Sequence, residues 1–196
     1  MNESEKELSS EESLKLINRM IHEAKGYFYE SGIGALVYGF SVLLCSLLAY
    51  AVDVKLISFP FSPFYLLVPV FFVQWIQWRE NKMKKARTFT DETIDYLWAG
   101  YFLSVIAAFS GNFAGITYMI ITIVLFLTGF AAFLTGMIAR FTYNKVCGII
   151  CLLFASVSFF IQNAGIYILL AVTAIIVWII PGFILNMTFK KQQYAR

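Results

Sequence analysis

The sequence contains few charged residues. Asp, Glu, Lys and Arg make up 14% of its 196 residues, whereas about 25% is usual in soluble domains. Apolar residues make up 60%, and residues 96–139 and 146–189 contain no Asp, Glu, Lys, Arg or His. Because a helix of about 20 residues spans the hydrocarbon core of a bilayer, each uncharged stretch is long enough for two crossings. The composition therefore excludes a soluble domain and predicts a membrane protein.

Three weakly charged stretches predict the fold. Residues 32–78 resemble the two uncharged stretches, because Asp53 and Lys55 are their only charged residues. We therefore expect an all-α, polytopic membrane protein with six transmembrane helices in three hairpins, at about 32–78, 96–139 and 146–189. An N-terminal segment (1–31) precedes this transmembrane domain (32–189), and a short tail (190–196) follows it. The expected helices cover residues 33–52, 63–78, 96–110, 116–138, 146–161 and 166–187.

The distribution of basic residues predicts the orientation. Lys and Arg accumulate in short cytoplasmic loops and near cytoplasmic helix ends. If both termini are cytoplasmic, every basic residue except Lys55 lies inside. The densest basic run contains Arg79, Lys82, Lys84, Lys85 and Arg87. No recognised nucleic-acid-binding motif follows this run and the net charge is only +3, so we expect an anchor to lipid headgroups and no nucleic-acid partner.

The N-terminal segment is the part of the chain that is polar by composition. It starts without the basic and apolar regions of a signal peptide. Its apolar residues recur at intervals of three and four, which predicts an amphipathic helix with one apolar face. This face consists of Leu14, Ile17, Ile21, Ala24 and Phe28. We expect the face either to pack on the cytoplasmic end of the bundle or in the membrane interface, or to dock a protein partner or a second copy of the chain.

The predicted membrane spans lack the residues that most catalytic sites need. They contain no Asp, Glu, Lys, Arg or His, although such residues inside a membrane usually mark function. The single histidine, His22, has no second histidine at zinc-protease spacing. Cys45, Cys147 and Cys151 fall inside predicted spans, where free cysteines behave as small apolar residues. We therefore predict a non-enzymatic protein with no catalytic residue, no cofactor and no metal site.

Aromatic residues cluster near the predicted ends of the spans. On the inner side these are Trp75, Trp78, Tyr96 and Trp98. On the outer side they include Phe59, Phe61, Phe64, Tyr65, Phe109, Phe113, Phe159, Phe160 and Tyr167. Trp and Tyr are enriched at membrane–water interfaces, so we expect both groups to form interfacial belts. Pro69 and Pro181 lie inside predicted helices and predict kinks there.

The segment "SSEESLKLINRMIHEAKGYFYESGIGALVYGFSVLLCSLL", residues 9–48, carries a family resemblance. It resembles the start of a group of small, uncharacterised bacterial multi-pass membrane proteins, in which a helix of the form "ESL-LI--MI--AK" leads into the first crossing. The resemblance implies a bacterial inner (plasma) membrane location. It implies no catalytic residue, because the group carries no assigned activity.

Two functional classes remain open from the sequence. The first is a membrane protein that acts through protein or lipid contacts, with the N-terminal helix as its docking element. The second is a small permease or the membrane subunit of an exporter, with Pro69 and Pro181 as gating kinks. A water-accessible cavity between the hairpins favours the second class, and a tightly packed bundle favours the first.

Overall fold

The structure, a computed structural model, describes residues 32–84, 89–110, 116–161 and 163–194. These residues form helices and connecting turns, and no strand occurs among them. The expectation of an all-α protein is confirmed. The predicted N-terminal helix lies outside the described residues, as do Lys85 and Arg87 of the basic run and the last two residues of the tail.

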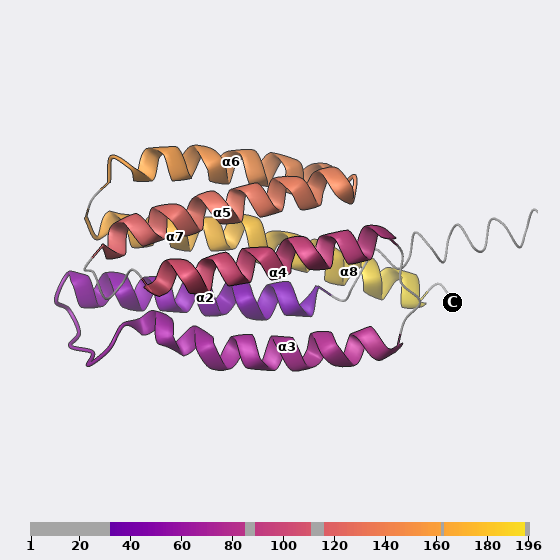
Figure 1. The fold of residues 1–196 in the computed structure, drawn as a ribbon, viewed down its shortest axis with the longest axis horizontal. Helices are drawn as coiled ribbons and strands as arrows, with labels where there is room; N and C mark the ends of the chain where they lie inside the picture. Colours follow the sequence, from indigo (N-terminus) through magenta and orange to yellow (C-terminus); the bar gives the residue numbers. More distant parts are fainter. Residues whose placement is uncertain (1–31, 85–88, 111–115, 162, 195–196) are drawn as a thin grey trace, which may run out of the picture.

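The helices follow the expected order along the chain and lie side by side as elongated rods (Figure 1). In the described ranges the elements are α2 (Ile33–Asp53), η1 (Pro63–Leu66), α3 (Leu67–Lys84), α4 (Phe89–Phe109), α5 (Thr117–Ile138), α6 (Thr142–Ser158), α7 (Gly165–Ala174), the π-helical turn η3 (Ile175–Ile179) and α8 (Ile180–Tyr194). The short helix η1 leads directly into α3, and α7, η3 and α8 form one continuous rod. The helix α3 continues past the expected end at residue 78 and reaches Lys84.

Three of these rods are long and apolar enough to cross a membrane. They are Ile33–Asp53, Thr117–Ile138 and Gly165–Met187. Two further apolar helices, Pro63–Ile76 and Thr142–Ser158, are shorter. A membrane protein is therefore supported by three candidate spans among the described residues, half the number that the sequence predicts.

The outer surface of the bundle is apolar on every rod. Leu44 on α2, Phe72 on α3, Leu103 on α4 and Leu153 on α6 are all at least 60% exposed. Further large apolar side chains are exposed on α5 and α8, among them Phe126, Phe130, Phe183 and Met187. Soluble monomers rarely expose contiguous apolar patches of more than a few hundred Å². This exterior suits hydrocarbon as the surrounding solvent.

The interior, in contrast, contains hydroxyl groups that are fully buried. Ser46, Thr122, Thr128, Ser158 and Thr173 are each at most 3% exposed. Their hydroxyls donate to backbone carbonyls three or four residues earlier in their own helices. Buried polar groups are costly unless hydrogen-bonded. This local bonding lets small polar residues pack between helices, as is common in membrane interiors.

Glycines bring α5 and α6 unusually close together. A Cβ atom added at Gly148 would lie 2.5 Å from the backbone nitrogen of Phe133, and one at Gly136 would lie 2.5 Å from that of Lys145. A Cβ atom at Gly129 would lie 2.9 Å from the nitrogen of Leu152. Small residues permit such backbone contact between membrane helices. This close pair joins the second predicted hairpin to the third (Figure 1).

Candidate functional site

The rod formed by α7, η3 and α8 is interrupted by a π-helical turn. Within η3 the N–H of Ile180 donates to the carbonyl of Ile175, five residues earlier. Pro181 follows immediately, and its ring removes a backbone donor and clashes with the carbonyl four residues before it. We attribute the widened turn to this proline. The hydroxyl of Tyr143 on α6 lies 3.5 Å from the carbonyl oxygen of Ile176, at the long limit of a hydrogen bond.

The π-helical turn places Trp178 at the centre of a group of aromatic rings. Its ring centroid lies 4.6 Å from that of Tyr38 on α2 and 4.7 Å from that of Trp98 on α4. Tyr101, also on α4, lies 6.3 Å away. Such separations are typical of favourable aromatic pairs. Because π-helical turns occur frequently at functional sites, this group is the candidate site of the described fold.

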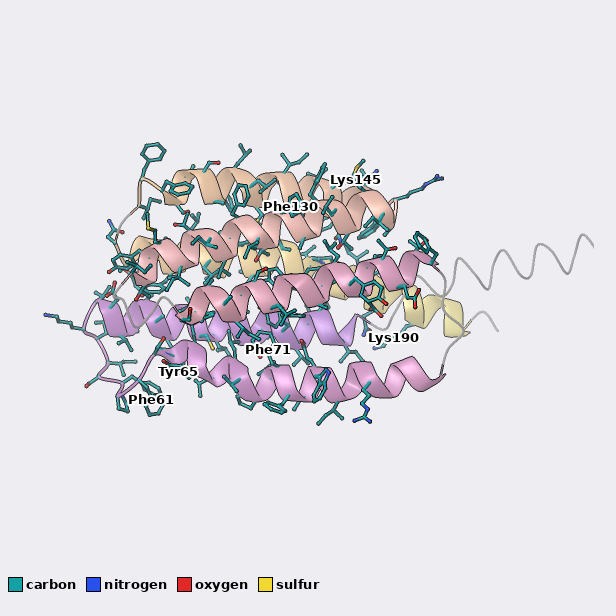
Figure 2. The ribbon with its side chains drawn as sticks, viewed as in Figure 1. Phe61, Tyr65, Phe71, Phe130, Lys145 and Lys190 are labelled. Atoms are coloured by element: carbon teal, nitrogen blue, oxygen red, sulfur yellow. The ribbon has the colours of Figure 1, made fainter. Side chains whose placement is uncertain are left out.

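Further rings extend this group to α3. Phe71 on α3 lies 5.7 Å from Tyr38 and 5.1 Å from Phe102 on α4, measured between ring centroids. Figure 2 labels Phe71 on its helix. We refer to Tyr38, Phe71, Trp98, Tyr101, Phe102 and Trp178 as the aromatic core. These rings fill the space between α2, α3, α4 and η3. The backbone of α4 lies closest to α5, so its contact with the other three elements is made by these side chains.

Glycine also sets the distance between α2 and η3. A Cβ atom at Gly39 would lie 2.7 Å from the Cβ of Trp178 and 2.9 Å from the Cγ1 of Ile179. The absence of a side chain at Gly39 therefore lets the π-helical turn approach α2 and brings Trp178 against Tyr38. Gly136 allows a similarly close approach between α5 and α6.

A small cavity lies beside the aromatic core. Its volume is about 30 Å³, and its walls come from α2, α3, α4, α5 and α7 together with η1 and η3. Its lining residues with polar side-chain atoms are Tyr38, Tyr101, Thr128, Thr173 and Trp178. The hydroxyls of Tyr101 and Thr128 lie 3.0 Å apart. A cavity needs roughly 10–15 Å³ of such volume to hold one water molecule. The cavity in this conformation can therefore hold a water molecule but not a larger solute.

A second polar contact joins the C-terminal end of α2 to α5. The hydroxyl of Tyr118 on α5 donates to the carboxylate of Asp53, with 2.8 Å between the oxygen atoms. The ring of Tyr118 lies 6.1 Å from that of Tyr167 on α7, and Phe64 lies 6.2 Å from Tyr167 on the other side. This group ties α2, η1, α5 and α7 together at one end of the bundle.

The three cysteines, which we predict to be non-catalytic, are packed inside the bundle. Cys45, Cys147 and Cys151 are free thiols, and each is at most 3% exposed. The thiol of Cys151 donates to the carbonyl of Leu125 on α5 at 3.3 Å. Within the described ranges, no group of three or more His, Cys, Asp or Glu side chains is placed to hold a metal ion.

The remaining predicted site residues are only partly described. Arg79 is exposed on α3, and the helix backbone continues through Lys82 and Lys84. Lys85 and Arg87 lie outside the described residues. So does the entire candidate docking face, which consists of Leu14, Ile17, Ile21, Ala24 and Phe28. The structure therefore places the start of the basic run at the polar end of α3 and leaves the docking face as a prediction.

Several aromatic residues that we expected in interfacial belts are packed inside the bundle. Trp98 contacts Trp178 in the aromatic core. Phe64 and Tyr167 are 8% and 7% exposed, and Phe109 packs against Phe64 with 5.9 Å between ring centroids. The expectation was wrong for the buried Phe64 and Tyr167, because position along a helix does not reveal which face meets a neighbour. For the partly exposed Trp98 and Phe109 it stays a prediction. Phe61 and Tyr65 are about half exposed and remain compatible with a belt (Figure 2).

Comparisons with family models, with curated proteins and with solved structures found no match to this chain. The resemblance of residues 9–48 to small bacterial membrane proteins therefore stays a prediction.

Proposed function

We propose that this chain crosses the bilayer six times, with both termini in the cytoplasm, and acts by binding protein or lipid. The observation that carries this proposal is the apolar exterior. Large apolar side chains are exposed even on rods outside the three candidate spans, such as Phe72 on α3, Leu103 on α4 and Leu153 on α6. The free-energy cost of exposing apolar surface to water, about 25 cal/mol for each Å², favours placing these rods in lipid as well.

The less apolar rods have features that suit short crossings. The acidic residues Asp91, Glu92 and Asp95 fall in the first two turns of α4, which leaves its remaining turns uncharged. The charged residues of α3 begin at Arg79, near the opposite end of that helix from its apolar start. Charged groups at the ends of a short span can reach the headgroup layer, and the bilayer can thin locally. The six-crossing topology thus requires no charge at the membrane centre.

The chemistry of the described interior supports binding rather than catalysis. Its buried hydroxyls belong to Ser, Thr and Tyr side chains, and the hydroxyl oxygens of Thr122 and Ser158 lie 3.0 Å apart. The charged residues that the structure describes lie toward helix ends, as Asp53 and Arg79 do. We propose the bacterial inner membrane as the location, on the basis of the resemblance and of the distribution of basic residues.

The N-terminal helix is the proposed docking element. Full burial of one Leu or Ile side chain contributes about 1.5–3 kcal/mol, so burying this apolar face against protein or lipid is favourable. We expect the variant Leu14→Ser/Ile17→Ser/Ile21→Ser to insert normally and to lose a partner that the parent chain retains during affinity purification in mild detergent. A matched control changes Lys15, Asn18 and His22, which lie off this face, to Ser.

Three results of this experiment are informative. Loss of the partner from the apolar-face variant alone supports the docking role. Loss of thermal stability in detergent with an unchanged set of partners shows that the helix packs on its own bundle. Unchanged stability, partners and membrane association contradict every form of the proposal.

The alternative function is a small permease or the membrane subunit of an exporter. The cavity beside the π-helical turn favours it, because broken helices line the substrate sites of many transporters. A Val124→Cys variant, with the three native cysteines replaced by Ala, tests the alternative, since Val124 lines the cavity. Labelling by a small water-soluble thiol reagent is expected of a permease. Protection of this cysteine favours the contact protein.

A further inference from the structure

The turn between α5 and α6 places two basic residues at the end of a candidate membrane span. The span Thr117–Ile138 ends two residues before Arg140, and α6 begins at Thr142. Lys145 lies in the first turns of α6. If α5 crosses the bilayer, this turn lies in the headgroup layer, whichever side of the membrane it faces and however many other helices cross.

Arg140 adopts a backbone conformation that usually favours glycine. Its φ angle is +53°. The N–H of Phe141 donates to the carbonyl of Gly136 at 3.0 Å, which closes the end of α5 in the manner of a left-handed helix cap. Glycine is the common residue at such a position. The chain instead carries an exposed guanidinium there, a group whose planar fork matches the geometry of phosphate oxygens.

Lys145 starts deeper in the bundle but can reach the same level. Its backbone nitrogen and Cγ atom lie 2.5 Å and 2.9 Å from the position of a Cβ atom at Gly136. Gly136 precedes Arg140 by four residues, or about 6 Å along a helix axis. The half-buried stem of Lys145 thus packs on α5, and a lysine side chain in this position extends its ammonium toward the headgroups. Figure 2 shows Lys145 toward the same end of the bundle as Lys190 of α8, opposite Phe61 and Tyr65.

Neither basic group pairs with a carboxylate of the residues that the structure describes. No ion pair is formed by Arg140 or Lys145 within the part of the chain that the structure describes. The sequence contains no Asp or Glu after Asp95, so the charged residues of α6 and α8 are all basic, and α5 and α7 carry no charged residue. Two positive charges at a membrane surface attract anionic lipid headgroups.

From these observations we propose that Arg140 and Lys145 form a binding site for the phosphate of an anionic phospholipid. Arg140 approaches the phosphate from the turn, and Lys145 approaches it from the bundle. The proposal requires that α5 spans the membrane, but it does not depend on the docking role of the N-terminal helix or on the six-crossing topology.

The test compares lipids and variants by thermal unfolding and by native mass spectrometry of the purified full chain in detergent. Phosphatidylglycerol is expected to raise the unfolding temperature of the parent chain more than phosphatidylcholine does, and to remain bound in the mass spectrum. The variant Arg140→Gly/Lys145→Gln is expected to bind phosphatidylglycerol about 30-fold more weakly, which corresponds to about 1 kcal/mol for each basic residue.

A matched control separates lipid binding from backbone effects. Lys55 follows α2 at the other end of the bundle and also has a left-handed backbone, with φ of +61°. Lys55→Gly changes the same kind of position, yet is expected to keep the parent's response to phosphatidylglycerol. Because Gly suits a left-handed position, Arg140→Gly is expected to fold at least as well as the parent.

Four outcomes would overturn the proposal, three with lipids and variants and one with inorganic phosphate. The first is an equal response to phosphatidylglycerol and phosphatidylcholine in the parent chain. The second is an unchanged response in the Arg140→Gly/Lys145→Gln variant, and the third is an equal loss in Lys55→Gly. Inorganic phosphate alone, tested at the same concentration, must give no comparable rise. If it does, the ligand is a free anion, and the assignment to a phospholipid is wrong.

Discussion

At the scale of single residues, glycine determines how closely the helices of this bundle approach. Gly148 faces the backbone of Phe133 on α5, whereas a Cβ atom at Gly100 on α4 would meet no atom within 4 Å. We therefore expect Gly148→Ala to destabilise the fold by about 1–3 kcal/mol through overpacking. Gly100→Ala is expected to be neutral or to stabilise by up to about 1 kcal/mol, because Ala favours helix. Thermal unfolding of both variants in one detergent measures the difference.

Equal effects of these two substitutions would contradict the close packing of α5 and α6. Helix propensity alone predicts that both variants gain stability. The sign of the effect at Gly148 therefore distinguishes a steric contact from an intrinsic preference.

The hydroxyl pair of Tyr101 and Thr128 gives a second prediction at this scale. The two oxygen atoms lie 3.0 Å apart and join α4 to α5. Interhelical hydrogen bonds in membranes contribute about 0.6 kcal/mol on average. A double-mutant cycle with Tyr101→Phe and Thr128→Val is expected to give a coupling energy of this size. In Tyr101→Phe the hydroxyl of Thr128 keeps its bond to the carbonyl of Val124 within α5. Each single variant is expected to remain folded, because only one interhelical bond is lost.

A cycle that pairs Tyr101→Phe with Ser156→Ala provides the control. The hydroxyl of Ser156 is bonded to Leu152 within its own helix, so it is expected to show no coupling to Tyr101. Coupling of equal size in both cycles would show that the bond between Tyr101 and Thr128 contributes nothing specific.

At the scale of elements, the sequence predicts where the helices are but not how they meet. The expected helix at 116–138 and the observed α5 (Thr117–Ile138) differ by one residue at one end. The expected helix at 96–110 begins seven residues later than α4, which starts at Phe89. The absence of charge identifies only the apolar part of a helix, and the first turns of α4 are polar. Hydropathy and charge identify apolar helices well, since each crossing requires a run of fixed minimum length.

The aromatic core could not be predicted in the same way. Tyr38, Phe71, Phe102 and Trp178 come from four separate elements, and their meeting depends on how these elements pack. In a lipid-embedded helix, apolar residues occupy both the buried and the exposed faces, so hydrophobic periodicity does not identify the inner face. The sequence shows Pro181 as a source of a kink. It does not show that the kink takes the form of a π-helical turn that orients Trp178.

The π-helical turn leads to a prediction about Pro181. In Pro181→Ala the new N–H can bond the carbonyl of Val177, four residues earlier, and restore regular helix. Loss of one inserted residue turns the adjoining segment by about 100° and moves Trp178 away from Tyr38. We expect the emission of Trp178 to shift in a chain whose other tryptophans are changed to Phe. An unchanged emission would show that packing against Gly39, rather than Pro181, maintains the turn.

At the scale of the whole molecule, the distribution of polar groups is opposite to that of a soluble protein. Exposed Leu44, Phe72, Leu103 and Leu153 surround buried Ser46, Thr122 and Ser158. This arrangement is stable only where the solvent is apolar and the buried hydroxyls are bonded. It agrees with a membrane environment for the three candidate spans, and it is the basis of our proposal that the shorter or more polar rods cross as well.

The central proposal is that six helices cross the membrane and that both termini are cytoplasmic. The most direct test labels single cysteines in intact cells with a membrane-impermeant thiol reagent, in a chain whose three native cysteines are changed to Ala. Cysteines placed at Asp53 and Asn163 are expected to react from outside, whereas those placed at Lys84 and Lys145 are expected to react only after the cells are opened. Reaction at Lys84 from outside, or protection of Asn163, would contradict the proposed topology.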